Sequence, residues 1–299
     1  MESSVYIILL NWNGLNDTNE CLQSLKKITY DNFEVVVVDN NSSGNDVNIL
    51  KEEFGGFTHK IIVNDSNLGF SGGNNVGIKY AIENGADYIL LLNNDTIVEP
   101  DFLDNLVSHV NINSSVGILT PVIKHYNNRS KIWAAGGKLS KLRGSGFAST
   151  EIGKSNAPSE VNFASGCALL IKREVFDKVG FLDENYFLYL EDTDFCYRTI
   201  KSGYKILLVP SSVIYHKINA STKENVSRLP LYYVTRNRLY FSNKNLGAWK
   251  FISITYIFFV SFLKLAIWTL ANKRNKVNAI KRGLRDFINR RMGKLDSKI

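Results

Sequence analysis

Apolar runs and helical patterns alternate along the first half of the chain. The runs suited to buried strands are Val5–Leu10, Glu34–Val38, Lys60–Val63 and Tyr88–Leu92, and helical patterns lie near residues 16–27, 46–54, 73–84 and 101–110. Alternation of this kind predicts βαβ units and a mainly parallel sheet. The expected fold class is therefore α/β, with helices flanking a central sheet.

Beyond residue 111 the alternation loosens. Lys138–Pro158 carries several Gly and Ser residues among charges, which predicts a mobile loop or crossover segment. The pattern tightens again at 163–171, where we expect another strand of the same domain. A short strand at Lys205–Val209 is then expected to lead through Pro210 to Val213–His216.

A polar cluster follows each of the four early strands. The clusters are Asn11-Trp12-Asn13-Gly14, Asp39-Asn40-Asn41-Ser42-Ser43, Asn67-Leu68-Gly69-Phe70 and Asn93-Asn94-Asp95. Open parallel sheets bind ligands beyond the carboxyl ends of their strands, so the clusters predict one shared site. Ordinary polar turns are the alternative, since Asn and Asp favour turns.

Glycines open the third predicted helix. The stretch from Asn67 to Gly77 contains Gly69, Gly72 and Gly73 and also Asn75. A helix start that the backbone can approach closely suits phosphate or ribose oxygens. The spacing matches neither the dinucleotide fingerprint nor the P-loop, so the glycines alone are a weak signal.

Three acids stand together in the second half. Glu191, Asp192 and Asp194 begin a predicted helix, where helix-dipole capping would favour acids. Three acids within four residues exceed what capping requires. Crowded carboxylates raise one another's pKa, which can prepare a general base for work near neutral pH. His216 is of interest only as a partner for Asp95, because a lone histidine is more often structural.

Composition narrows the classes of function. The 299 residues include 44% hydrophobic and 21% charged residues, as in a globular protein, and three widely spaced cysteines, which favour a reducing compartment. The amino terminus shows no signal-peptide pattern. The net charge of +8 equals ten Lys or Arg minus two Asp between Lys273 and Lys298, so residues 1–272 are formally neutral. A nucleic-acid-binding function would have to rest on this tail.

Taken together, these motifs resemble glycosyltransferase family 2, and more narrowly its rhamnosyltransferase-like branch. The resemblance rests on Asn11-Trp12-Asn13, Val38-Asp39-Asn40, Asn67-Leu68-Gly69-Phe70 with Asn75, Asn93-Asn94-Asp95, Glu191-Asp192-Thr193-Asp194-Phe195 and His216. It covers roughly residues 4–245. It implies a GT-A fold, which is Rossmann-like, with a nucleotide-sugar-binding half at 1–110 and an acceptor-binding half at 111–245. The remaining residues, 246–299, are expected to form a hydrophobic and basic amphipathic membrane-anchoring segment.

The resemblance also implies roles for single residues. Asp192 would be the catalytic base, with Glu191 and Asp194 contacting the acceptor or supporting the base. Asp95 and His216 would bind a divalent metal, Mn²⁺ or Mg²⁺. The family motif is Asp-x-Asp, and Asn93 replaces its first acid here, which leaves Asp95 as the only certain acidic ligand. The remaining residues would bind the nucleotide sugar: Asn11, Asn13, Asp39, Asn40, Asn67, Gly69, Asn75, Asn93, Asn94 and, as a diphosphate contact, Arg236.

The reaction so implied is an inverting, metal-dependent transfer to a saccharide hydroxyl in cell-surface glycan assembly. The donor would be a nucleotide diphosphate sugar, dTDP-rhamnose first and otherwise a UDP- or GDP-sugar. The acceptor would be a polyprenyl-diphosphate-linked saccharide. Two alternatives stay open, namely a noncatalytic nucleotide-sugar-binding module and a nucleic-acid-binding protein that uses the basic tail.

The segment 251–271 is apolar enough to span a bilayer, interrupted only by Lys264. Apolar residues recur at helical spacing among the basic residues that follow, which is typical of an interfacial helix on anionic lipid. A single span would separate the catalytic domain from the basic tail, although both favour the cytoplasmic side. We therefore expect a monotopic anchor on the cytoplasmic face of the membrane.

Overall fold

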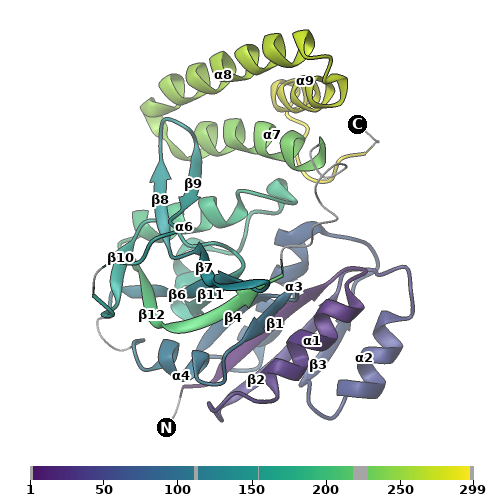
Figure 1. The fold of residues 1–299 in the computed structure, drawn as a ribbon, viewed down its shortest axis with the longest axis vertical. Coiled ribbons are helices and arrows are strands. Elements are labelled where there is room, and N and C mark those ends of the chain that lie inside the picture. Colours follow the sequence, from purple (N-terminus) through teal and green to yellow (C-terminus); the bar gives the residue numbers. More distant parts are fainter. Residues whose placement is uncertain (1–2, 111–113, 154, 218–227, 297–299) are drawn as a thin grey trace.

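The computed structural model describes residues 3–110, 114–153, 155–217 and 228–296. Its main sheet has the strand order β10-β12-β6-β11-β4-β1-β2-β3 (Figure 1). The first-half strands are β1 (Val5–Asn11), β2 (Phe33–Asp39), β3 (Lys60–Val63) and β4 (Tyr88–Asn93). They pair in parallel, which confirms the predicted α/β class.

The second half extends this sheet with mixed pairing. β11 (Ala168–Lys172) runs antiparallel to both β4 and β6 (Val116–His125), and β12 (Lys205–His216) runs parallel to β6. Two short strands join at the edges, β5 (Thr96–Val98) on β12 and β7 (Asn128–Ala134) on β6. β12 is one strand with an irregularity between Val209 and Val213, where the two predicted pieces meet at Pro210.

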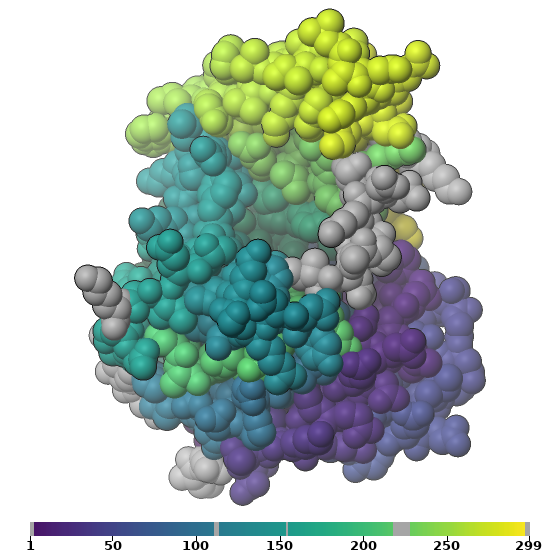
Figure 2. Space-filling model, viewed as in Figure 1, coloured from purple at the N-terminus to yellow at the C-terminus, as the bar shows by residue number. Residues whose placement is uncertain are grey.

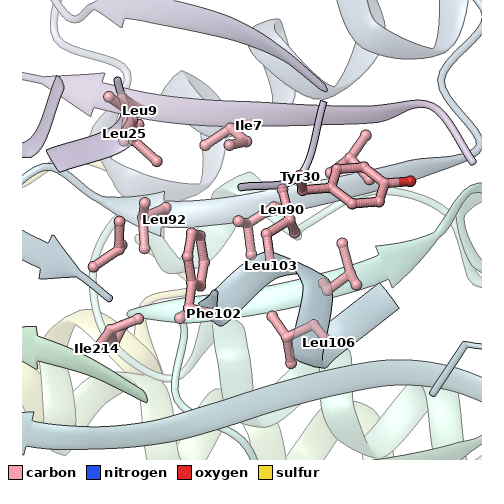
Figure 3. Packing of buried hydrophobic residues seen from close by; sticks show 14 of the residues in the cluster. Ile7, Leu9, Leu25, Tyr30, Leu90, Leu92, Phe102, Leu103, Leu106 and Ile214 are labelled. Carbon is pink, nitrogen blue, oxygen red and sulfur yellow. The ribbon is translucent and has the colours of Figure 1, made fainter. Parts of the chain in front are cut away.

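Helices cover both faces of the sheet. One face of β1 packs against α1 (Leu15–Leu25), α2 (Asp46–Phe54) and α4 (Phe102–Val107), and Figure 3 shows this layer around Leu9, Leu90 and Phe102. The other face packs against α3 (Gly69–Glu83), α5 (Arg173–Val179) and α6 (Glu191–Lys201). Strands buried on both faces are apolar throughout, which explains the continuous runs in the sequence.

The expectation of a loop at Lys138–Pro158 was wrong for its first half. Gly137–Ser140 and Ser145–Ala148 form the hairpin β8–β9, and β10 (Ser159–Val161) pairs with β12. Gly144 closes the hairpin turn with a φ of 56°. The hairpin packs so closely on the ring of Phe163 that a Cβ at Gly146 would lie 2.3 Å from it. This packing is a tertiary contact, which turn-forming residues cannot reveal. Residue 154 lies outside the described residues.

Three helices follow the sheet and form a layer of their own: α7 (Arg228–Asn245), α8 (Lys250–Leu270) and α9 (Arg274–Ile288), with the 3₁₀ turn η3 (Gly247–Trp249) between the first two. α8 lies along α7 instead of projecting away from the domain (Figure 1), and Figure 2 shows α8 and α9 as a cap above a hollow in the surface. Leu239, Ile257 and Ile280 join the three helices in a small core.

The outer face of α8 is apolar and its inner face includes polar residues. Phe259, Phe262 and Leu270 are 60%, 60% and 90% exposed, whereas Ser253 and Ser261 are buried. Among the described residues, Gly247–Leu270 is the one helical stretch, of 24 residues, long and apolar enough to cross a membrane. Lys298, the last basic residue of the tail, lies outside the described residues.

Candidate active site

The ends of β1 and β2 meet in a buried hydrogen-bond network. Asn11 Nδ2 donates to Asp39 Oδ1 at 2.8 Å and also to Ser42 Oγ and Asp46 Oδ2, both at 3.1 Å. Asp39 accepts two further bonds from the backbone N–H and hydroxyl of Ser42. Asn11 and Asp39 are almost fully buried. The structure thus brings these two predicted residues together and fixes the loop that follows β2.

A second amide network joins the β2 end to the start of α3. Asn40 Nδ2 donates to Asn67 Oδ1 and to the Gly69 carbonyl, both at 3.1 Å, and Asn67 Oδ1 also accepts from the Gly69 N–H at 2.8 Å. Gly69 has a φ of 75°, and a Cβ there would lie 2.4 Å from the carbonyl oxygen of Phe187. Only glycine fits this turn, because a side chain would meet both strain and a clash.

The second network forms part of the wall of a cavity of about 1080 Å³. Trp12, Asn40, Asn67 and Gly69 line it at the strand ends, and later parts of the chain complete the lining: Phe187, Leu188, Arg228, Leu229, Tyr233, Lys294 and Leu295. A cavity of this size accommodates a nucleotide-sized ligand. Trp12, 56% exposed, offers an aromatic face for stacking. Its place between two asparagines was a usable signal that sequence analysis left out of the site.

Asp95 and His216 meet across the sheet. His216 Nε2 lies 3.1 Å from the Asp95 carboxylate, because β12 pairs with β5 and sets His216 opposite Thr96. The other ring nitrogen, Nδ1, is buried and has no hydrogen-bond partner among the described residues, and the same is true of Asp95 Oδ1. The pair therefore has nitrogen and oxygen atoms that can ligate a cation.

The neighbouring asparagines lie at the same strand end. Asn94 Nδ2 donates to Thr18 Oγ1 at 2.8 Å, and the Asn93 carbonyl accepts from Thr96 Oγ1 at 2.7 Å. Over the residues that the structure describes, no group of three or more His, Cys, Asp or Glu side chains is placed to hold a metal. A cation here would depend on Asp95, His216 and neutral oxygens, consistent with the replacement of an acid by Asn93.

Glu191 and Asp192 begin α6 beside this edge. Asp192 Oδ2 accepts from the Gly166 N–H at 3.1 Å, and Oδ1 accepts from the Thr193 N–H at 2.6 Å. Burial raises the pKa of Asp192, and these hydrogen bonds oppose the rise. Burial and then the charge of Asp192 raise the pKa of Glu191 to about 8. Glu191 Oε2 has no hydrogen-bond partner among the described residues. Within the pair, Asp192 is the better solvated carboxylate.

Two hydrogen bonds connect Asp192, through Gly166 and Cys167, to the end of β4, which precedes Asp95. Gly166, which donates to Asp192, precedes Cys167, whose carbonyl accepts from the Asn93 N–H at 2.9 Å. The start of α6 and the end of β4 are therefore linked through Gly166 and Cys167, although about a hundred residues separate them in sequence.

Three other predicted site residues are turned into the protein. Asn75 is buried, bonds to both backbone polar groups of Leu182 and to Glu184, and does not line the large cavity. Asp194 is fully buried and accepts from Arg198, Lys244, Asn245 and Tyr186. Arg236 is 1% exposed and bonds only to protein groups among the described residues. Asn13, by contrast, is exposed, and its Oδ1 accepts from Ser43.

The sequence profile described as Glycosyl transferase family 2 matches residues 4–180. The hexosyltransferase Agl10 of low-salt glycan biosynthesis in Haloferax volcanii is 26% identical over 69% of this chain, which spans 64% of Agl10. The dTDP-rhamnosyl transferase RfbF of Shigella flexneri is 28% identical over 82% of each chain. An N-acetylglucosaminyl-diphospho-decaprenol L-rhamnosyltransferase of Mycobacterium tuberculosis is 34% identical over 31% of each chain.

Solved structures share the fold. S. aureus TarS 1-349 in complex with UDP-GlcNAc superposes with a TM-score of 0.64 and 18% identity, covering 96% of this chain and 81% of that one. The mannosyltransferase PcManGT of Pyrobaculum calidifontis, in complex with GDP-Man and Mn²⁺, superposes with a TM-score of 0.62 and 13% identity, covering 96% and 88%. At these identities the likeness concerns the fold.

Proposed function

The chain belongs to glycosyl transferase family 2 and is a glycosyltransferase of the GT-A fold, and from this premise we propose that it inverts the anomeric centre of a sugar carried by a nucleoside diphosphate. The sugar proposed first is rhamnose from dTDP-rhamnose, because RfbF is named for that donor. The acceptor proposed is a hydroxyl of a saccharide on a polyprenyl diphosphate, since the mycobacterial relative is named for such a substrate. The product would belong to a cell-surface polysaccharide or glycan.

The observation that carries this proposal is the placement of Asp192. Its carboxylate lies next to Gly166, and Gly166 lies beside the end of β4, where Asp95 follows. On the proposed division into a nucleotide-sugar half, 1–110, and an acceptor half, 111–245, this carboxylate would lie near their junction. A base at that junction can reach an acceptor hydroxyl while the donor lies along the strand ends.

The residues of the chain would divide the work as follows. Asn40 and Asn67, on the cavity wall, would bind the nucleotide, and the buried Asn11–Asp39 pair would support the loop after β2, so that little ordering would accompany binding. Asp192 would accept the proton of the acceptor hydroxyl. At the same time the hydroxyl oxygen would bond to the anomeric carbon, and the bond from that carbon to the diphosphate would break. Burial raises the pKa of Asp192, which makes its carboxylate a stronger base toward the acceptor hydroxyl. A single displacement inverts the centre without a covalent intermediate.

Asp95 and His216 fit a divalent cation. The Asp95 carboxylate and His216 Nε2 face each other at 3.1 Å, and an oxygen with an imidazole nitrogen is a mixed donor set that suits Mn²⁺. When bound, the cation would neutralise charge that develops on the leaving diphosphate. Asn93 and Asn94 are positioned to add neutral carbonyl oxygens at the same strand end.

The segment 246–299 is proposed to anchor the enzyme in one leaflet, on the cytoplasmic face. α8 lies along α7 with polar side chains inward and Phe259, Phe262 and Leu270 outward, which is the polarity of a helix that faces lipid. α9 adds basic residues that anionic headgroups attract. This arrangement keeps the active site and the basic tail on the same side, within reach of a lipid-linked acceptor.

The test combines donor binding with transfer. Full-length protein is screened for protection against thermal unfolding by dTDP-rhamnose, UDP-GlcNAc and GDP-mannose, each with and without Mn²⁺. We expect one donor to protect in a metal-dependent way and to release its nucleoside diphosphate when a polyprenyl-diphosphate saccharide is added. Asp192→Asn should keep the protection and lose about 100-fold or more of the transfer rate. Near-normal transfer by this variant would refute the assignment of the base, and protection without any transfer would indicate a noncatalytic binding module.

A further inference from the structure

The segment that leads into Glu191 and Asp192 has an unfavourable backbone. After the 3₁₀ turn η1 (Glu184–Tyr186), the residues Phe187, Tyr189 and Leu190 have φ values of 62°, 67° and 73°. Residues other than glycine rarely adopt this region, and they hold it only where surrounding contacts enforce it. We call residues 183–190 the base-leading loop. Leu190 is the residue directly before α6, so its conformation sets where α6 begins.

Asn237 of α7 is fully buried and holds the strained part of the loop. Its Nδ2 group lies 3.0 Å from the Tyr186 carbonyl oxygen, 2.9 Å from that of Leu188 and 2.8 Å from that of Tyr189. Irregular backbone leaves carbonyl groups without secondary-structure partners, and a buried carbonyl must find another donor. The Asn237 side-chain amide is this donor for the part of the loop with positive φ.

Arg236 holds the amino-terminal side of the same loop. Nη2 donates to the Tyr186 and Asn185 carbonyls at 3.2 and 3.4 Å, and Nε donates to Asn237 Oδ1 at 2.9 Å. Nη1 donates to the Tyr232 hydroxyl at 3.2 Å and to the Gly293 carbonyl at 2.9 Å. A guanidinium has five N–H donors, and these contacts use all of them. None is left for the diphosphate contact that the sequence predicted.

The same arginine connects the loop to the carboxyl-terminal segment. The Gly293 N–H donates to the Asn185 carbonyl at 2.8 Å, while the Gly293 carbonyl accepts from Arg236. The Tyr232 hydroxyl donates to Asp286 of α9 at 2.9 Å. The base-leading loop is therefore clamped between α7 and the residues that follow α9.

The loop also reaches the cavity. The Phe187 carbonyl accepts from the Phe70 N–H at 2.7 Å, and Phe187 and Leu188 line the same cavity as Asn40 and Asn67. One loop therefore determines both the start of α6, where Asp192 lies, and a wall of the donor cavity.

We propose that Arg236 and Asn237 are positioning residues that fix the base-leading loop and, through it, the Asp192 carboxylate. The proposal rests on the proposed function for the role of Asp192. Neither side chain lines the large cavity. Both act by supplying donors to loop carbonyls, in the way that supporting contacts preorganise a catalytic group.

The informative variant is Asn237→Asp, which keeps the shape of the side chain and sets a carboxylate against three carbonyl oxygens. Arg236→Lys is the milder companion, because an ammonium keeps the charge but has three donors instead of five. The matched control is Arg238→Lys on the same helix, whose Nε donates to the Arg143 carbonyl of the β8–β9 turn, away from the loop.

The first measurement is amide hydrogen exchange in the full-length protein, which needs no substrate. In Asn237→Asp we expect exchange of the loop amides to become about tenfold faster or more, while the central strands keep their wild-type rates. Arg236→Lys should show a smaller increase confined to the same amides, and Arg238→Lys none. Unchanged loop exchange in both Asn237→Asp and Arg236→Lys would overturn the proposal, as would an equal increase over loop and sheet. If Asn237→Asp does not fold, Arg236→Lys decides the question.

The second measurement is transfer from dTDP-rhamnose to a polyprenyl-diphosphate saccharide. Positioning predicts that kcat falls about tenfold or more, whereas KM for the donor rises by a smaller factor, because the strand-end side of the cavity stays intact and only the wall at Phe187 and Leu188 loosens. A rise in KM alone would contradict it. If the wild-type protein transfers nothing from this donor, the proposal that rhamnose is the transferred sugar is wrong. The hydrogen-exchange measurement still tests whether Arg236 and Asn237 fix the loop.

Discussion

Glu191→Gln offers a direct test of how this site treats its buried acids. Glu191 is 6% exposed, and burial followed by the charge of Asp192 raises its pKa from 4.5 to about 8. Glutamine has the shape of a protonated glutamate but does not titrate. The substitution therefore removes one ionisable group with little change in packing.

The direction of the stability change follows from proton binding. Because the folded-state pKa lies above the unfolded value, the folded protein holds this proton between about pH 4.5 and pH 8 and the unfolded chain releases it. The contribution of Glu191 to stability is fully present below pH 4.5 and is lost as the pH rises through 8. Within that window the free energy of unfolding falls by up to about 1.4 kcal/mol for each pH unit.

The assay is urea unfolding of the wild-type and variant proteins at several pH values from 5 to 9. We subtract the free energy of unfolding of wild type from that of Glu191→Gln at each pH. We expect this difference to increase with pH up to about 8 and then to level off. Glu174→Gln is the matched control, because the Glu174 side chain is 62% exposed and far from the site, and its difference from wild type should not follow this course. A difference for Glu191→Gln that is constant across the range would refute the reasoning.

Two further predictions concern the cation and the membrane. Asp95→Ala should abolish the extra thermal protection that Mn²⁺ gives with a bound nucleotide sugar, since no second acid of the Asp-x-Asp motif compensates. The control Asp101→Ala, on the exposed start of α4, should keep this protection. Metal-dependent protection of Asp95→Ala would contradict the assignment. The double substitution of Phe259 and Phe262 by Asp should weaken flotation of the full-length protein with anionic vesicles about tenfold or more, because it removes two exposed aromatic rings from α8. The control Phe147→Asp, on the β8–β9 hairpin, should float like wild type. Equal flotation of both variants would exclude α8 as the docking face.

Local patterns predicted much of the fold correctly. The strands β1 to β4 lie within a residue or two of their predicted positions, because side chains buried on both faces of a parallel sheet leave continuous apolar runs. The strand ends could be inferred too, since the carboxyl ends of parallel strands share an edge. Asn11 with Asp39 and Asp95 with His216 do meet there.

The β8–β9 hairpin and the true position of Arg236 could not be predicted in this way. The hairpin forms where Gly-rich chain docks on Phe163, and nothing within 137–148 announces that partner. Arg236 lies on a helix with no clear apolar stripe, so its basic side chain could equally have faced solvent or diphosphate. Its orientation depends on carbonyls of a loop some 50 residues earlier and of Gly293 some 57 residues later.

The sequence alone therefore determined the sheet, the polar edge and the acids at the start of α6, because hydrophobic periodicity and strand-end chemistry are properties of neighbouring residues. Tertiary structure alone decided which polar side chains face the cavity and which satisfy the backbone. Buried carbonyl groups in irregular backbone need hydrogen-bond donors, and packing decides which donor lies nearest. Asn237 and Arg236, for example, donate to carbonyl groups of the loop that precedes Asp192.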